Sequence, residues 1–269
     1  MASRASSDPL IFGTYLAPSS VEAYRFVAEQ VGTVTGRGAR LVVGRSYDEL
    51  LDSSVDVAFI CGWPYVRLVA QNPGRIELLA APVLSGSRYQ GKPVYFSDVI
   101  VRAGSPVERF EDLRGHSWSF NEPTSYSGYL ATLYHLARMG ERGPFFGRAV
   151  AAGSHQESIR KVASGEVDAS AIDSQVLELE LRRHPELRPE LRVIESFGPA
   201  AIQPVVASDR LDAGLRRDIK SAIRAVSGEP LRACLFESFV SVDDGAYDRM
   251  RQAEQQVMAA RLTLSANRL

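Results

Sequence analysis

Strand-like and helix-like segments alternate along most of this chain, and that order leaves few folds open to it. Short apolar runs such as 10–15 and 55–62 have the character of strands, and segments such as 20–32 have the spacing of helices. The alternation predicts βαβ units and a mostly parallel sheet in an α/β protein. The expected strands are 10–15, 39–46, 55–62, 76–84, 94–103, 116–123, 148–154, 167–173 and 191–198, and from residue 211 onward we expect a largely helical, charged segment.

One pattern occurs twice and predicts two lobes built on one plan. A Ser followed three residues later by Glu, the capping-box pattern, opens a short helix that runs into a Val-Asp pair and a strand. The copies contain Ser46, Glu49, Val55 and Asp56, and Ser154, Glu157, Val167 and Asp168. Tyr47 and His155, directly after the two Ser caps, would then lie at helix N-termini. Ligands of open α/β sheets bind outside the carboxyl ends of the strands, so both side chains are candidates for binding.

The segment 121–130, NEPTSYSGYL, places more hydroxyl groups before a helix than one cap requires. Four hydroxyl residues follow one another in it, Thr124, Ser125, Tyr126 and Ser127. One Ser or Thr is enough to accept hydrogen bonds from the first free N–H groups of a helix. A helix N-terminus carries unpaired donors and a partial positive charge, so the additional hydroxyls suit an anion. The alternative is a helix cap followed by a polar loop.

Charge, cysteine and histidine content argue against several classes of function. The 269 residues carry a formal net charge of −1, which gives no general attraction to nucleic acid or to an anionic membrane. Cys61 and Cys234 are too few for a disulfide framework and lack metal spacing. The four histidines form no H-x-x-x-H pattern. We therefore expect a globular protein without a nucleic-acid partner, a metal or a cofactor.

The N-terminal segment MASRASSDPL has no apolar core of the kind that a secretory signal needs. No run of about 18 apolar residues, long enough to cross a membrane as a helix, occurs in the sequence. The chain is therefore either cytosolic or the mature form of an exported protein whose signal was removed or not included.

These segments together resemble a known family. NEPTSYSGYL, followed after a helix and a strand by GSHQESIRKVASGEVDASAID, is similar to the phosphate/phosphonate-binding proteins of ABC transporters, a branch of the type II periplasmic binding proteins. The similarity extends from FGTY through SYDELL and VDVAFICG to YFSDVIVRAGSP and EDLRG. It implies two α/β lobes joined by two crossover strands, with a ligand cleft between lobes that close by hinge motion. Lobe 1 would contain 1–98 and 202–269, lobe 2 would contain 99–201, and the crossovers would lie near 97–102 and 197–203.

The resemblance also implies binding residues. The Ser-Thr-Ser triplet with which the family holds phosphonate matches Ser125, Tyr126 and Ser127. The family's cleft histidine matches His155, and its two cleft tyrosines match Tyr47 and Tyr95. For His155 the alternative is a structural role at a helix start. For the two tyrosines it is a place in the core.

Other aromatic side chains are further candidates to line the cleft. Tyr15 ends the first expected strand, and Trp63 and Tyr65 follow the third. The neighbouring Gly62 and Pro64 suggest the alternative that this segment only forms a turn.

Three positions depart from the family's pattern. Members that bind aminoalkyl phosphonates hold the ammonium group with two acidic residues, and the matching positions here are Gln175 and Gln203. Neutral amides do not offset the cost of burying an ammonium group. The expected ligand is therefore not 2-aminoethylphosphonate, unless Asp173 supplies a replacement acid. Tyr126 in place of the central Thr adds a ring, which would either shrink the pocket or stack on a larger ligand.

The prediction is a solute-binding protein that captures phosphate, phosphite or a non-amino phosphonate for an ABC importer. Its expected partners are the oxyanion and the permease, and by resemblance it is a monomer of the periplasm or cell envelope. The alternative is a cytosolic enzyme or sensor domain of the same fold that acts on another small molecule. Ser125 and His155 could serve as nucleophile and base, but no G-x-S-x-G elbow and no third orienting group is identifiable.

Overall fold

The computed structural model describes residues 8–264, which divide into two compact units. Of these residues, unit 1 comprises 8–94 and 201–247, and unit 2 comprises 95–200 and 248–264. Part of the N-terminal segment that lacks a secretory core, 1–7, lies outside the described residues, as does 265–269, which was assigned to lobe 1.

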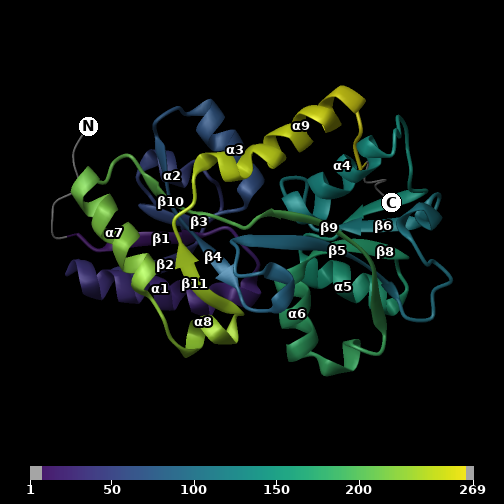
Figure 1. Cartoon of the computed structure of the whole chain (residues 1–269), viewed down its shortest axis with the longest axis horizontal. Coiled ribbons are helices and arrows are strands. Elements are labelled where there is room, and N and C mark those ends of the chain that lie inside the picture. Colours follow the sequence, from purple (N-terminus) through teal and green to yellow (C-terminus); the bar gives the residue numbers. More distant parts are fainter. Residues whose placement is uncertain (1–7, 265–269) are drawn as a thin grey trace. The chain divides into compact units, whose positions relative to one another are not determined.

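Unit 1 is built around a six-stranded sheet with the order β11-β4-β10-β3-β1-β2 (Figure 1). Its strands are β1 Leu10–Thr14, β2 Ala39–Val43, β3 Val57–Phe59, β4 Ile76–Leu84, β10 Val205–Ser208 and β11 Phe236–Val240. β1 pairs in parallel with β2 and β3, whereas β10 is antiparallel to β3 and β4. All of β1 is buried, as expected for a parallel strand covered on both faces.

Five α-helices complete the described part of unit 1. They are α1 Val21–Thr35, α2 Glu49–Asp52, α3 Gly62–Gln71, α7 Ala213–Ala225 and α8 Glu229–Ala233. α1 packs against α7 and α8 and buries Ala23, Val27 and Val31, which recur every four residues on one face. It ends at Gly36, whose φ of 67° is the left-handed conformation that glycine adopts without strain.

Unit 2 contains a five-stranded sheet with the order β7-β6-β8-β5-β9. Its strands are β5 Val94–Arg102, β6 Ser117–Phe120, β7 Arg148–Ala151, β8 Ala169–Asp173 and β9 Leu191–Ala201. β6 is parallel to β7 and β8, and β5 is antiparallel to β8 with Ser97 opposite Asp173.

Helices lie on both sides of the sheet of unit 2. They are the short π-helical turn η4 Tyr126–Leu130, α4 Ala131–Arg138, α5 His155–Ser164, α6 Ser174–Arg183 and α9 Asp248–Ala260. Figure 1 shows α4 and α9 on one side and α5 and α6 on the other. Ile159 and Val162 of α5 pack with Ile100 of β5 and Ile172 of β8, and this apolar cluster holds α5 against the sheet.

The repeated sequence pattern corresponds to a repeated structure. β1, β2 and β3 of unit 1 have the same pairing as β6, β7 and β8 of unit 2. In each set, the Asp of the Val-Asp pair accepts a hydrogen bond from the start of the central strand. Asp56 Oδ2 accepts from the N–H of Ile11 and Asp168 Oδ2 from the N–H of Ser117, both at 2.8 Å. The pair therefore ties together the beginnings of two neighbouring strands.

Three segments differ from the sequence-based expectation. Gly62 and Pro64 are not a turn but open α3, because proline is tolerated in the first helical turn, where its missing N–H is not needed. Residues 236–240 form β11 within the segment expected to be largely helical. Helix α9 groups with unit 2, where it packs on α4, although all of 202–269 was assigned to lobe 1.

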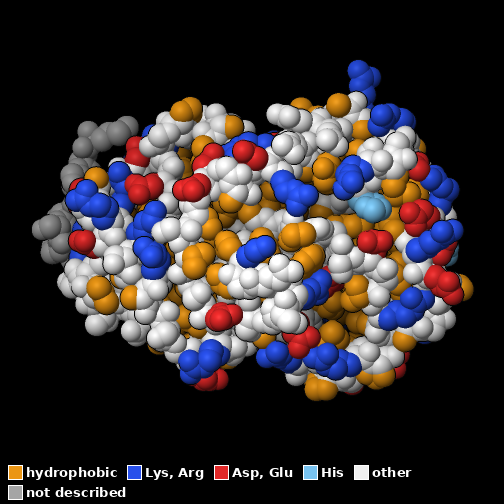
Figure 2. All heavy atoms as spheres, viewed as in Figure 1, with side chains coloured by type: hydrophobic (Ala, Val, Ile, Leu, Met, Phe, Trp, Pro, Cys, Tyr) orange, Lys and Arg blue, Asp and Glu red, His pale blue; other side chains and the backbone are white. Residues whose placement is uncertain are grey.

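Basic and acidic side chains are interspersed on the face drawn in Figure 2. Some form ion pairs within a helix, such as Arg182 with Glu178 at 2.9 Å on α6. Within residues 8–264, no helix is both long and apolar enough to cross a membrane.

The two Val-Asp pairs provide a matched test of the fold. Asp56→Ala should lower the free energy of unfolding by about 2 to 3 kcal/mol, because the buried N–H of Ile11 loses this partner. Asp168→Ala should cost about 1 kcal/mol or less, because its side chain is 47% exposed and water can replace it. Urea unfolding of both variants measures the difference, and equal losses would contradict it.

Candidate functional site

The hydroxyl-rich segment after β6 forms the beginning of a helix in unit 2. Ser125 precedes η4, and its Oγ accepts a hydrogen bond from the N–H of Gly128 at 3.1 Å. The predicted helix cap is therefore confirmed at Ser125. Tyr126 and Ser127 are also buried, whereas Thr124 is exposed and lies outside this group.

Ser127 and His155 are joined by a buried hydrogen bond. Ser127 Oγ lies 3.1 Å from His155 Nε2, and the two residues are 3% and 6% exposed. The hydroxyl of Ser97 on β5 donates to the carbonyl oxygen of Ser127 at 2.6 Å, which fixes the backbone of the turn. The structure thus brings together three of the predicted binding residues, Ser125, Ser127 and His155.

His155 is the first residue of α5, as the sequence pattern predicted. Ser154 Oγ accepts from the N–H of Glu157 at 3.1 Å, which is the first half of the predicted capping box. The Glu157 carboxylate instead bonds to Arg160. Burial lowers the pKa of His155 from its usual 6.5 to about 4, so the ring is neutral at pH 7. A neutral imidazole has one N–H donor and one nitrogen acceptor.

Asn121 and Gly128 complete this group, and we name Asn121, Ser125, Ser127, Gly128 and His155 the serine–histidine cluster. A Cβ atom on Gly128 would lie 2.0 Å from Asn121 Oδ1 and 3.2 Å from His155 Cε1, so a larger residue there would force a neighbouring side chain to move. Asn121 Oδ1 and His155 Nδ1 are buried and bond to no other described residue. Sequence reasoning singled out neither Asn121 nor Ser97. The only signal for Asn121 was its place at the start of NEPTSYSGYL.

This arrangement can bind a small oxyanion. Two serine hydroxyls and a neutral imidazole lie beside the first turn of a helix, where backbone N–H groups lack helical partners. Hydrogen bonds from such groups to an anion are charge-assisted and therefore strong. Among residues 8–264, no group of three His, Cys, Asp or Glu side chains could hold a metal ion.

Tyr126 and Tyr95 lie near each other inside unit 2. They are 7% and 1% exposed, and their ring centroids are 6.4 Å apart in a tilted arrangement. Little of either ring surface is exposed, which corresponds to the core position considered for Tyr95. Their part in binding stays a prediction.

Asp173 and Gln175 lie at the end of β8 and the beginning of α6. Asp173 Oδ1 accepts hydrogen bonds from the N–H groups of Gln175 at 2.8 Å and Val176 at 3.3 Å. Both Asp173 and Gln175 are buried. The Asp173 carboxylate therefore caps α6, which is a structural use for the residue considered as a replacement acid.

Tyr15 and Tyr47 lie together in unit 1, but not at the predicted helix start. Their ring centroids are 4.9 Å apart, and α2 begins only at Glu49, with Asp48 in the cap position. The predicted capping box of Ser46 and Glu49 is wrong, because Ser46 Oγ accepts from the N–H of Asp48 and not from that of Glu49. The Glu49 carboxylate accepts from the N–H of Arg45 at 3.2 Å and from the Tyr15 hydroxyl at 2.7 Å. Burial, with the nearby Glu49 carboxylate, raises the pKa of Tyr15 well above its usual value, so its hydroxyl stays protonated and directed at Glu49.

Trp63 and Gln203 are the other predicted binding residues of unit 1. Trp63 lies in the first turn of α3 and is 7% exposed, with the guanidinium of Arg67 at 5.5 Å from the ring centroid. Tyr65, beside it in sequence, donates its hydroxyl to Asp244 at 2.7 Å. Gln203 is half-buried between β9 and β10. Binding by Trp63 and Gln203 stays a prediction.

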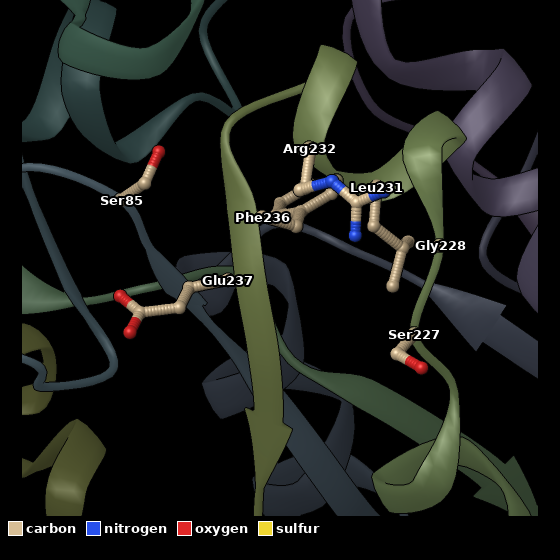
Figure 3. Close-up of a pocket in the computed structure, with 7 residues that line it drawn as sticks. All are labelled: Ser85, Ser227, Gly228, Leu231, Arg232, Phe236 and Glu237. Carbon is tan, nitrogen blue, oxygen red and sulfur yellow. The ribbon is translucent and has the colours of Figure 1, made fainter.

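A pocket of about 260 Å³ lies in unit 1 beside β11 and α8 (Figure 3). It is lined by Ser85, Ser227, Gly228, Leu231, Arg232, Phe236 and Glu237. None of the predicted binding residues lines it, and the exposed Arg232 side chain pairs with Glu229 at 3.0 Å. The pocket belongs to a different unit from the serine–histidine cluster.

The close approach at Gly128 yields a prediction. Gly128→Ala should displace Asn121 or His155 and lower the free energy of unfolding by about 1 to 3 kcal/mol, the usual cost of overpacking. Gly143→Ala is the matched control, because its Cβ would meet nothing within 4 Å. Thermal and urea unfolding measure both. A Gly128→Ala protein as stable as the control would contradict the close approach.

The neutral burial of His155 predicts a pH dependence of stability. Between about pH 6.5 and 4 the unfolded chain binds a proton at this residue that the folded protein does not. The free energy of unfolding therefore falls as the pH decreases through this range, by about 3 kcal/mol in total. His155→Gln should remove this part of the decrease. Urea unfolding of both proteins from pH 7 to pH 4 measures it, and parallel curves would contradict neutral burial.

Comparison with known proteins connects this geometry to a family. The model of the family described as "ABC transporter, phosphonate, periplasmic substrate-binding protein" matches residues 11–247. A binding protein component of an ABC phosphonate transporter from Pseudomonas aeruginosa is 19% identical, with a TM-score of 0.80 over 97% of this chain and 90% of that chain. PhnD1 from Prochlorococcus marinus, solved with methylphosphonate, is 18% identical, with a TM-score of 0.80 over 94% and 99%.

A Xanthomonas citri protein solved with ATP is also similar, at 18% identity and a TM-score of 0.71 over 96% of this chain and 100% of that chain. At these identities the solved structures show the fold alone. They confirm the predicted two-sheet α/β fold of type II periplasmic binding proteins. The family match, in contrast, covers most of the sequence. The chain therefore belongs to the periplasmic substrate-binding proteins of phosphonate ABC transporters.

Proposed function

We propose that this protein binds a small phosphorus oxyanion without an amino group and presents it to the permease of an ABC importer. The candidate ligands are phosphate, phosphite and alkylphosphonates such as methylphosphonate. The observation that carries the proposal is the buried contact of 3.1 Å between Ser127 Oγ and His155 Nε2 beside the start of η4. The family match and the methylphosphonate bound to PhnD1 support the same ligand class.

The cluster suits an oxyanion because its groups are polar, positioned and neutral. The Ser125 hydroxyl accepts from the N–H of Gly128 and the Ser127 hydroxyl bonds to His155, so both hydroxyls are ordered before a ligand arrives. Little conformational entropy is then lost on binding. Several converging hydrogen bonds to one anion compensate for removing it from water.

The residues at the two acidic positions of the family favour a ligand without an amine. Gln175 and Gln203 are neutral amides, and Gln175 is buried. A buried ammonium group without a carboxylate partner would cost several kcal/mol. Asp173 is the nearest acid in sequence to Gln175, and its Oδ1 already caps α6.

An enzyme that uses Ser and His is the second candidate, and the geometry gives it less support. His155 bonds to Ser127, whereas Ser125 Oγ accepts a backbone hydrogen bond from Gly128. In a Ser–His–Asp triad a buried carboxylate orients the imidazole through its other nitrogen. Among residues 8–264, no carboxylate bonds to His155 Nδ1. We infer binding without chemistry on the ligand.

The proposal includes a place of action. The family is described as periplasmic, so we infer that this protein acts in the periplasm as a monomer beside its permease. A sensor domain of the same fold would bind a small molecule too, but it would be joined to a signalling partner. Co-purification with the permease separates these two roles.

Ligand binding by wild-type protein and by a double variant tests the proposal. Methylphosphonate, phosphite or phosphate should raise the melting temperature of the wild type, since a ligand that binds only the folded state stabilises it. 2-Aminoethylphosphonate should bind more weakly than methylphosphonate. Ser125→Ala combined with Ser127→Ala should weaken binding at least about 100-fold, because two hydrogen bonds to a charged group are worth about 1.5 kcal/mol or more each.

The matched control combines Ser164→Ala and Ser221→Ala, which removes two exposed hydroxyls. Isothermal titration calorimetry should give this control the affinity of the wild type. Unchanged binding in the Ser125/Ser127 double variant would contradict the site, and the absence of binding to any phosphorus oxyanion would contradict the ligand class.

A further inference from the structure

We infer that the serine–histidine cluster recognises a protonated oxyanion: His155 donates its Nδ1–H to Asn121, and Ser127 accepts a hydrogen bond from an acidic P–OH of the ligand. The inference rests on the proposed function and deepens it. It assigns a positioning role to Asn121 and a proton requirement to the ligand.

The starting observation is a pair of buried polar atoms at the cluster. Asn121 Oδ1 and His155 Nδ1 bond to no other residue in the described part of the chain. Both side chains converge on Gly128, whose added Cβ would lie 2.0 Å from Asn121 Oδ1 and 3.2 Å from His155 Cε1. Asn121 and His155 are 8% and 6% exposed, so bulk water has little access to form hydrogen bonds with either atom. Buried polar atoms without partners are rare in native proteins and need an explanation.

The neutral ring of His155 has two arrangements of its proton. A proton on Nε2 would leave Nδ1 as a bare acceptor near another acceptor, Asn121 Oδ1, and both would stay unsatisfied. A proton on Nδ1 can be donated to Asn121 Oδ1, which borders the same Gly128 position as the ring, and Nε2 then accepts the hydroxyl of Ser127 at 3.1 Å. The second arrangement satisfies every group, so we assign it.

This arrangement changes what Ser127 offers to a ligand. Its only hydroxyl proton is used on His155, so Ser127 Oγ faces the ligand with its lone pairs and acts as an acceptor. An oxygen without a proton would be repelled there, whereas a P–OH can donate. The other ligand oxygens accept hydrogen bonds from the hydroxyl of Ser125 and from the N–H groups at the start of η4. The ligand class is therefore the hydrogen phosphonate, hydrogen phosphite or hydrogen phosphate anion.

Nitrogen-15 NMR of the ligand-free protein tests the proton arrangement directly. The chain has four histidines, and a His155→Gln variant identifies the resonances of this ring. At pH 7 we expect the chemical shifts of a neutral ring that is protonated at Nδ1. A ring protonated at Nε2 would overturn the inference, because Asn121 would then have to donate through its amide nitrogen. This measurement does not depend on ligand binding.

A pair of ligands tests the proton requirement. The methylphosphonate monoanion and methanesulfonate have the same charge and nearly the same shape, but only the first carries a hydroxyl proton. At about pH 6 we expect calorimetry to show methylphosphonate bound at least about 100-fold more tightly, as in other sites where a missing hydrogen leaves a buried group unpaired. Equal affinity would overturn the inference while leaving the proposed function in place. Binding of neither would overturn both.

Asn121→Ala, which removes the amide and adds no bulk beside Gly128, tests the positioning role. Without the acceptor the ring can donate through Nε2, and the Ser127 hydroxyl is then free to donate to the ligand. Methanesulfonate should therefore bind more tightly, and the ratio of the methylphosphonate affinity to the methanesulfonate affinity should fall at least about tenfold. The Nδ1-protonated signature should also be lost. An unchanged ratio together with an unchanged NMR signature would show that Asn121 does not hold the proton.

Discussion

The buried hydrogen bond between Ser127 and His155 is the interaction on which the candidate site depends. It joins the turn after β6 to the first residue of α5, 28 positions further along the chain. Neither group is accessible enough to replace this partner with water, so losing the bond would leave both polar groups buried and unsatisfied. The packing of α5 on the sheet therefore determines the geometry of the site, and the Ser97 hydroxyl fixes the backbone on the other side.

The repeated pattern explains why this bond can form. In each unit, the Asp of the Val-Asp pair aligns the beginnings of two parallel strands, and the strands end at the edge where helices begin. In unit 2 this places η4 and α5 side by side, with one contributing serines and the other an imidazole. In unit 1 the same plan gives a different surface, because Glu49 bonds to Tyr15 instead of capping α2.

The parts of the site that the sequence predicted are those with local signals. Alternating segments indicated the α/β class, a run of hydroxyls indicated the cap at Ser125, and the Ser154 pattern placed His155 at a helix start. The contacts that it missed connect residues far apart in the chain. The Tyr15 hydroxyl bonds to Glu49, which lies 34 positions later in the chain. Helix α9 belongs to unit 2, although the strand before it, β11, belongs to unit 1. No local pattern indicated a role for Asn121, because its position beside His155 depends on the close approach of both side chains to Gly128.

The neutrality of the cluster matters as much as its shape. Arginine and lysine side chains can only donate hydrogen bonds, so a site built from them attracts anions whether or not an oxygen carries a proton. Hydroxyl, imidazole and amide groups can donate or accept, and which they do depends on the neighbours that order them. Because burial keeps His155 neutral, the cluster carries no positive charge that would attract every anion. Its selectivity instead depends on which of its groups donate hydrogen bonds and which accept them. A ligand binds such a site well only when its own protons complete that arrangement of donors and acceptors.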